Sequence, residues 1–342
     1  MGMAEYFALL FLGFSVVTSI FCYAVLKDKT PNADGQCLPI SLSPMMSKYS
    51  FLKIINNEAK PKSIVSRLFK GEESQNQEIP ILSYSIERDT LFYEKMVHWQ
   101  SAKSIEGIVP NISSRNYHIE SRTFLFGTDR FGRSLLSRIL VGMRYSLFIG
   151  FTAVSLSFII GMAIGLCAGY FGGWVDIFLS YIMNIVWSLP TVLFIFAIIL
   201  AFGKSLGVLI LAIALTIWVD LARIVRSMCK SQKETLYIQA TKVMGLSLPN
   251  IWRHHLIPNI LGTVWVISST NFATAILIEA GLGYLGLGIA PPTPTLGNIL
   301  NENFTFALAG KLNLMLIPSF FIICLVLSFN ILSEYLKKSL SA

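Results

Sequence analysis

Between two long apolar segments the chain carries Gln239-Ala240-Thr241-Lys242-Val243-Met244-Gly245, and Ile257-Pro258 follows twelve residues after the glycine. Apolar side chains recur here at the spacing of an α-helix, at Leu236, Ala240, Val243 and Met244. This spacing predicts a short helix with one apolar face.

The residues after this helix predict a turn and a second helix. Gly245 suits the left-handed position that ends a helix. Ser247 offers an N-cap and Pro249 fits the first turn of the next helix, which we expect Pro258 to break. The segment 231–259 is therefore predicted to form two short helices joined by a glycine turn.

The segments on both sides of this loop are long enough to cross a membrane. A spanning helix needs about 20 apolar residues, and six runs qualify, at 6–26, 145–168, 177–202, 206–224, 260–280 and 314–332. We expect all six to be helices, because a backbone in lipid must satisfy its own hydrogen bonds. Pro190 interrupts the third run. No cationic leader or cleavage site accompanies the first run, so residues 1–29 are predicted to be an uncleaved anchor.

Composition supports a multi-pass membrane protein. The 342 residues are 54% hydrophobic and 13% charged, with a net charge of +8 and a mean hydropathy of +0.63. The basic residues are not interleaved with aromatic residues on a soluble fold, which disfavours nucleic-acid binding. Solvated loops and the preference of basic residues for the cytoplasmic side account for these charges.

The basic loop sets the orientation. Its charges are Arg223, Arg226, Lys230, Lys233, Lys242 and Arg253, so it is predicted to be cytoplasmic. With six spans, both termini are then cytoplasmic and 27–144 is external. Lys27 and Lys29 after the first span argue the opposite, but six charges outweigh two. A basic, amphipathic cytoplasmic loop is typical of docking to a soluble partner, although an ordinary basic loop, or one lying on anionic lipid, is a competing interpretation.

The external segment 30–122 is too long for a structureless connection. We expect a small subdomain with mobile stretches, of which 70–78 has the composition most typical of disorder.

Motifs for catalysis, nucleotide binding and metal binding are missing. The chain has no GxxxxGK[ST], HExxH or GxSxG sequence, and its four histidines lie outside the predicted spans. The five cysteines show no metal or disulfide spacing, and packing is the simplest explanation for them. The sequence therefore predicts a protein that is not an enzyme and binds no cofactor or metal itself.

The basic loop resembles the coupling loop in permease subunits of bacterial ABC importers, where a Glu-Ala-Ala triplet, a Gly and a distal Leu-Pro recur. Gln239, Ala240 and Thr241 stand at the triplet, Gly245 at the glycine, and Ile257-Pro258 at the Leu-Pro. Gln for Glu and Thr for Ala are departures, and the first removes a negative charge that could pair with the ATPase. The resemblance implies that residues 234–250 insert into a cytoplasmic ATPase.

Other motifs narrow the resemblance. Gly127-Thr128-Asp129-Arg130-Phe131-Gly132-Arg133 is similar to the GTDxxGRD signature of the second permease subunit of dipeptide and oligopeptide importers, with Ser134 where Asp is usual. The stretches 169–176, 218–226 and 279–294 also match that subunit, so the likeness covers about 123–342. It implies an all-α, six-helix importer permease (type I) with a large insertion after the first helix. It also implies a homologous second permease, two cytoplasmic ATPase subunits that use ATP, and an extracytoplasmic peptide-binding protein.

Charged and small residues within the spans have competing roles. A structural pair with Arg223 is the favoured interpretation of Asp220, with the translocation path as the alternative for both residues. Glu279 is equally compatible with the translocation path and with a structural role. Gly150, Gly161, Gly165 and Gly169 are spaced for close helix packing. The competing function is a secondary transporter or channel, which would need broken helices and inverted repeats. Co-isolation of ATPase subunits would separate the two functions.

Overall fold

The computed structural model describes residues 2–26, 28, 30–54, 71, 77–87, 90–101, 104–109 and 117–341. The predicted disordered stretch 70–78 lies outside the described residues except at Gly71, Gln77 and Glu78. The chain divides into two compact units. Unit 1 comprises Met1–Phe14, Ser146–Ala290 and Phe321–Ala342, and unit 2 comprises Ser15–Tyr145 and Pro291–Phe320.

Long helices occupy every predicted span. They are α1 (Met3–Ile20) with the short α2 (Cys22–Val25), α4 (Leu135–Phe171), α7 (Leu206–Lys233), α10 (Ile257–Tyr284) and α12 (Asn313–Ser341). The third predicted span is occupied by a pair of shorter helices, α5 (Gly173–Ser188) and α6 (Thr191–Phe202). Five helices are long and apolar enough to cross a membrane, or six when this pair is counted as one. The pair is bent by 91° at Leu189 and Pro190, because proline at this point cannot continue the hydrogen-bond ladder. The predicted interruption at Pro190 is confirmed.

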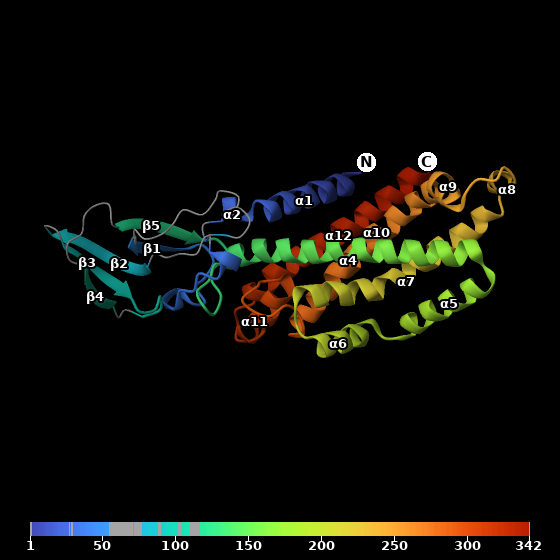
Figure 1. The fold of residues 1–342 in the computed structure, drawn as a ribbon. Helices are drawn as coiled ribbons and strands as arrows, with labels where there is room; N and C mark the ends of the chain where they lie inside the picture. The colour runs from blue at the N-terminus through green and yellow to red at the C-terminus, as the bar shows by residue number, and fades with distance from the viewer. Residues whose placement is uncertain are drawn as a thin grey trace. The chain divides into compact units, whose positions relative to one another are not determined.

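Helix α7 is the centre of unit 1. Most of its apolar side chains are buried among α4, α6 and α10, and Figure 1 shows α7 running beside α4. The two backbones approach closely along the glycines of α4. A Cβ atom on Gly165 would lie 2.6 Å from the carbonyl oxygen of Ala222, and one on Gly169 would lie 2.7 Å from that of Arg226. The predicted close packing is confirmed, and no larger residue fits at these two positions.

The loop after α7 contains α8 (Leu236–Val243) and α9 (Leu248–Ile251), followed by the π-helical turn η3 (Trp252–Leu256). The prediction that Pro258 breaks the second helix is wrong, since 248–284 runs as one continuous helical segment. Pro258 lies in the first turn of α10. The π-helical turn η3 immediately precedes Pro258, and this wider turn accommodates the proline within the helical segment.

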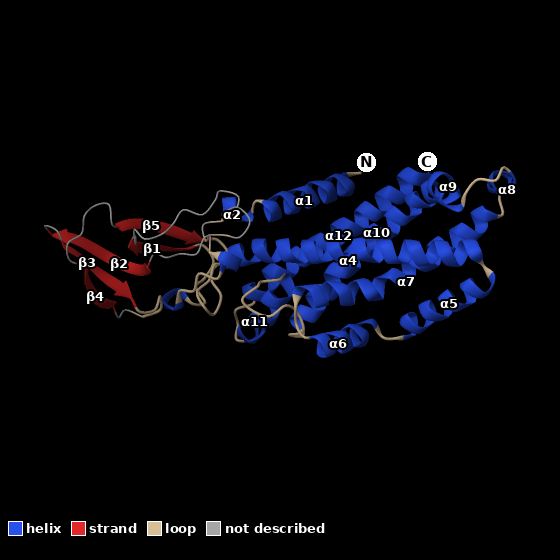
Figure 2. Ribbon diagram, in the orientation of Figure 1, coloured by secondary structure: helices blue, strands red, loops and turns tan. Residues whose placement is uncertain are grey.

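Unit 2 holds a five-stranded antiparallel sheet, drawn in red in Figure 2. Its strands are β1 (Ser47–Ile54), β2 (Gln77–Glu87), β3 (Thr90–Met96), β4 (Ser104–Val109) and β5 (Tyr117–Phe124), in the order β4-β3-β2-β1-β5. Phe51 and Leu52 are both buried because neighbouring residues point to opposite faces, and each face has its own apolar cluster. The expected external subdomain is therefore a β-sheet.

Unit 2 also contains the 3₁₀ turns η1 (Pro31–Ala33) and η2 (Leu38–Ile40), together with the helix α11 (Leu296–Leu308). No sequence pattern predicted the helix α11. This helix begins with a cap, in which the Thr295 hydroxyl accepts a hydrogen bond from the Asn298 N–H. Its buried side includes Leu296, Ile299 and Asn303.

Candidate functional site

The glycine turn after α8 is built as the sequence predicts. Gly245 has a φ of +76°, its N–H donates to the carbonyl of Lys242, and the N–H of Leu246 donates to the carbonyl of Thr241. These two bonds form a Schellman motif, which needs a residue in the left-handed conformation. Ser247 stands at the N-cap of α9, but its side chain makes no capping hydrogen bond. The turn therefore fixes where α8 ends and how the chain leaves it.

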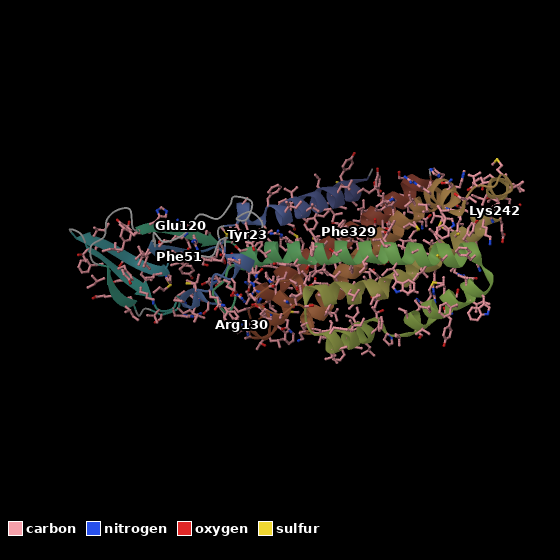
Figure 3. The ribbon with its side chains drawn as sticks, viewed as in Figure 1. Tyr23, Phe51, Glu120, Arg130, Lys242 and Phe329 are labelled. Atoms are coloured by element: carbon pink, nitrogen blue, oxygen red, sulfur yellow. The ribbon has the colours of Figure 1, made fainter. Side chains whose placement is uncertain are left out.

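Helix α8 presents its predicted apolar face to the outside. Leu236 is 84% exposed and Val243 is 89% exposed, while Ile238 on the opposite side is fully buried. An apolar side chain at such exposure gains nothing from the helices of its own chain. Lys242, labelled in Figure 3, lies on this helix beside the exposed residues. The result is a short helix with exposed apolar side chains and the basic Lys242 among them.

The three triplet residues do not share one environment. Gln239 is exposed, and its amide donates to the carbonyl of Glu234 over 3.1 Å. Ala240 is exposed as well. Thr241 is buried, and its hydroxyl donates to the carbonyl of Ile238 over 2.7 Å. The threonine therefore faces the chain's own core, and only the glutamine departure lies on the outer surface.

A side-chain hydrogen bond joins α8 to the start of α10. The Asn259 amide donates to the Tyr237 hydroxyl over 2.6 Å, one residue after the predicted Ile257-Pro258 pair. Ile257 packs on the apolar cluster that contains Ile238 and Leu256, whereas Pro258 is exposed. The structure thus brings both ends of the predicted loop together through Tyr237 and Asn259. The sequence analysis did not identify this pair, because its members lie 22 residues apart.

The expected Asp220–Arg223 ion pair is absent, and that prediction is wrong. The Arg223 guanidinium instead donates to the side-chain oxygen of Asn184 over 2.8 Å and lies 4.3 Å from the ring centroid of Trp187. Both partners belong to α5, and a planar guanidinium can satisfy an amide and an aromatic face together. Within the described part of the chain, no hydrogen bond or ion pair engages the carboxylate of Asp220, which is exposed.

Glu279 lies in the interior of unit 1. It is fully buried, and the Ser146 hydroxyl of α4 donates to its Oε2 atom over 2.7 Å. The two in-span acids of the sequence analysis therefore differ. Glu279 sits between packed helices, and Asp220 faces outward from the single chain.

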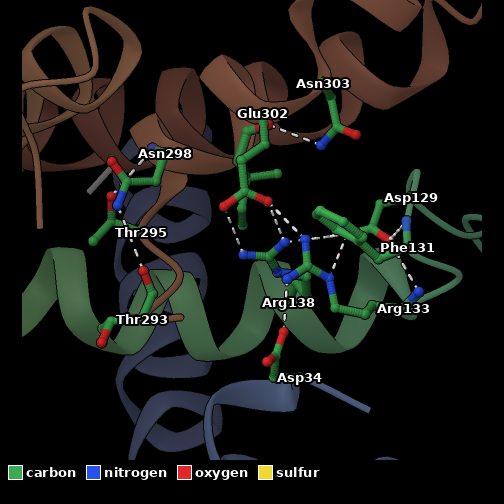
Figure 4. Close-up of polar contacts among 11 residues, drawn as sticks. Asp34, Asp129, Phe131, Arg133, Arg138, Thr293, Thr295, Asn298, Glu302 and Asn303 are labelled. Atoms are coloured by element: carbon green, nitrogen blue, oxygen red, sulfur yellow. Dashed lines mark hydrogen bonds and ion pairs between the residues drawn. The ribbon is translucent and has the colours of Figure 1, made fainter. Parts of the chain in front are cut away.

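A buried ion cluster forms around the motif at 127–133 in unit 2 (Figure 4). The Arg133 guanidinium contacts three carboxylates, those of Asp34, Asp129 and Glu302, each at 2.7 Å. Arg138 also pairs with Asp129 and Glu302, and the side chains of Arg138 and Asp129 are each only 1% exposed. The cluster therefore ties the motif to α4, α11 and the segment before the sheet.

Electrostatics and backbone geometry both fix this cluster. Burial raises the pKa of Glu302, but hydrogen bonds and charge from Arg138 and Arg133 outweigh it, so this pKa is lowered overall. Gly132 has a φ of +72°, and a Cβ atom there would lie 1.8 Å from the Cys37 carbonyl oxygen. The sequence analysis identified the motif by resemblance but missed Glu302, for which the only sequence signal was an acid in an apolar stretch.

Within the described residues, no group of three or more His, Cys, Asp or Glu side chains is arranged to hold a metal ion. Helix α8 has exposed apolar side chains, whereas the segment 127–133 is held by buried ion pairs.

Comparison with known proteins agrees with the motifs. A family model described as "Binding-protein-dependent transport system inner membrane component" matches residues 161–342. The chain is similar to the dipeptide transport system permease protein DppC of Alkalihalophilus pseudofirmus, with 39% identity over 63% of this chain and 70% of the relative. It is also similar to the oligopeptide transport system permease protein OppC of Bacillus subtilis, with 32% identity over 64% and 72%. A solved structure of the MetNI methionine ABC transporter aligns with a TM-score of 0.46 at 20% identity, over 60% of this chain and 95% of that one.

Proposed function

Because the chain belongs to the family of binding-protein-dependent transport system inner membrane components, we propose that it is the permease subunit of an ATP-driven importer. Its substrates are dipeptides, oligopeptides or peptide-like compounds, the first two being the compounds for which the relatives are named. The alternative, a secondary transporter or channel without an ATPase, provides no soluble partner for the outward apolar face of α8.

The single observation that carries the proposal is that exposed face. Residues 234–250 insert into a cleft of a separate cytoplasmic ATPase, with Leu236, Val243 and Met244 as the apolar contacts. A short helix laid into a groove is a recurrent way to dock two proteins. Gln239, Ala240, Gly245 and Pro258 lie on the surface of this coupling loop, while Thr241 and Ile257 support it from within.

The proposal extends to the topology of the chain and to its partners. The chain lies in the bacterial inner membrane with both termini in the cytoplasm, and residues 30–122 are an external insertion between the anchor at 1–29 and the permease region at 123–342. A homologous second permease, two ATPase subunits and an extracytoplasmic peptide-binding protein complete the transporter. ATP is hydrolysed by the ATPase subunits, and this chain binds no cofactor.

We assign the two in-span acids different roles. The exposure of Asp220 supports a place on the translocation path or against the second permease, because a carboxylate is costly in lipid. The burial of Glu279 beside Ser146 supports a structural role. Arg223 fixes α7 against α5 through Asn184 and Trp187, next to the surface that carries Asp220.

Replacing Gly245 tests the proposal. A valine there must adopt a left-handed backbone at a cost of roughly 1–2 kcal/mol, which would redirect the end of α8 and abolish peptide uptake. Asparagine tolerates this conformation better, so Gly245→Asn should keep part of the uptake. Gly207→Ala is the matched control, because a Cβ atom there meets nothing within 4 Å. Normal uptake by Gly245→Val, at wild-type amounts in the membrane, would sink the proposal.

A further inference from the structure

Aromatic side chains gather where α4 ends. The rings of Tyr170 and Trp252 meet edge to face with centroids 5.9 Å apart, and Phe171 meets the same indole at 6.2 Å. Tyr170 and Phe171 are the last two residues of α4, and Trp252 is the first residue of η3. This contact joins α4 to the helical segment that follows the coupling loop.

The ring of Tyr170 also lies beside two ammonium groups from other elements. The Nζ atom of Lys242 is 5.0 Å from its centroid, and that of Lys233 is 5.6 Å away. Cations within about 6 Å of an aromatic face are attracted by its electron density. Lys233 is the last residue of α7, and Lys242 lies in the last turn of α8. One side chain therefore contacts α7, α8 and η3.

Tyr170 belongs to a stiff part of the molecule. The close backbone approach at Gly165 and Gly169 leaves no room for α4 and α7 to slide past each other without a clash. By contrast, α8 is a helix of eight residues with an exposed outer face. Lys242 lies beside this outer face and adds a contact with the α4–α7 frame at Tyr170, next to the buried Ile238, which packs on the apolar side chains of the same two helices.

We propose that Tyr170 is a positioning residue for energy coupling, in which its aromatic face holds Lys242 and thereby ties α8 to the α4–α7 frame. Movement that the ATPase imposes on α8 is then passed to the membrane helices through this contact as well as through the buried Ile238, and less of it is passed when the contact is lost. This inference rests on the proposed importer function and adds a named connection between the docking surface and the helices.

The test uses the complete transporter, with both permeases, the ATPase subunits and the binding protein, reconstituted in lipid vesicles. ATP hydrolysis and uptake of a radiolabelled pool of di- to pentapeptides are measured together, and their ratio reports coupling. Tyr170→Phe keeps the ring and should keep the wild-type ratio. Tyr170→Leu removes the ring face and should lower the ratio about two- to five-fold, the size expected for one exposed cation–π contact, while hydrolysis continues.

Fluorinated phenylalanines at position 170 distinguish the cation–π contact from a role of the ring in packing alone. Successive fluorines deplete the ring face of electron density at nearly constant size, so the ratio should fall stepwise with fluorine number. Lys242→Gln should match Tyr170→Leu, and the double variant should be no worse than either single variant. Phe171→Leu is the control, because Phe171 contacts Trp252 in the same cluster and neither lysine is placed over its ring.

An unchanged ratio across the fluorinated series would overturn the role of Tyr170. If Gly245→Val abolishes uptake in the same vesicles, the importer function stands and only this inference fails. If Gly245→Val has no effect, the proposed function itself fails. A stepwise fall together with a silent Phe171→Leu would support the inference.

Discussion

The segment 127–133 and the helix α8 are both short, and each carries a motif with a glycine in the left-handed conformation in it or directly after it. They differ in which side chains they bury and which they expose. The first buries the charges that it pairs, with the side chains of Asp129 and Arg133 only 1% and 5% exposed. The second exposes its apolar residues, with Val243 at 89%. A motif whose groups are all satisfied internally holds the fold together. A motif that leaves apolar surface unsatisfied has its partner outside the chain.

The largest expected effect is the loss of Arg138. Arg138→Leu leaves the carboxylates of Asp129 and Glu302 buried with one fewer cation, and breaking a buried ion cluster in this way costs about 3–5 kcal/mol. Thermal unfolding of the purified transporter should show a large decrease in stability. Removing a carboxylate as well, in Arg138→Leu/Glu302→Leu, should recover part of the lost stability.

Arg130 provides the matched control for this comparison. It lies in the same motif but is exposed, and in the described part of the chain its guanidinium lies 4.5 Å from the ring centroid of Phe131 with no ion pair. Arg130→Leu should change the stability by less than about 1 kcal/mol. Equal losses for Arg130→Leu and Arg138→Leu would mean that burial does not distinguish the two arginines.

The next effect tests the other side of the comparison. Val243→Asp places a charge on the outer face of α8, where the wild-type side chain contacts little of its own chain. The stability of the isolated permease should change by less than about 0.5 kcal/mol. Peptide uptake and co-purification with the ATPase should fall at least about ten-fold, because the charge would be buried in the cleft. Met244→Ser should lower uptake and co-purification as well, but by less. A strong loss of permease stability in Val243→Asp would contradict the conclusion that Val243 points out of the chain.

The sequence was sufficient for the features that depend on neighbouring residues. Apolar length predicted the spanning helices, proline chemistry predicted the break at Pro190, and helix-end chemistry predicted the left-handed Gly245. It was insufficient where the contacts of a side chain are made with residues far away in the sequence. Arg223 was assigned to Asp220 because the two are three residues apart, but Asn184 and Trp187 on α5 engage it instead.

The same limit explains the other misses. Pro258 continues a helix because η3 precedes it, and no periodicity signals a π-helical turn. Glu302 joins Arg133 across 169 residues of sequence. The apolar face of α8 was visible, but spacing alone does not say whether such a face points into the core or out of it. Ile238, which is not part of the predicted face, faces the core instead.

The smallest expected effect concerns pH and distinguishes the two motifs by their ionisable groups. Since the pKa of Glu302 is lower in the folded chain than its ordinary value near 4.5, ionisation of Glu302 adds stability that is complete above that value. This stability is lost as the pH falls through the lowered folded value. The difference in unfolding temperature between wild type and Glu302→Gln should therefore be largest near neutral pH and shrink in acid.

Glu120 on the sheet also has a lowered pKa, because Lys53 and Arg122 outweigh the effect of its burial, but it is present in both proteins and cancels in the comparison. Val243→Asp compared with Val243→Asn should show no such trend in stability, because this position is exposed. A difference for Glu302→Gln that stays constant with pH would remove the ion cluster from the explanation of the fold's stability.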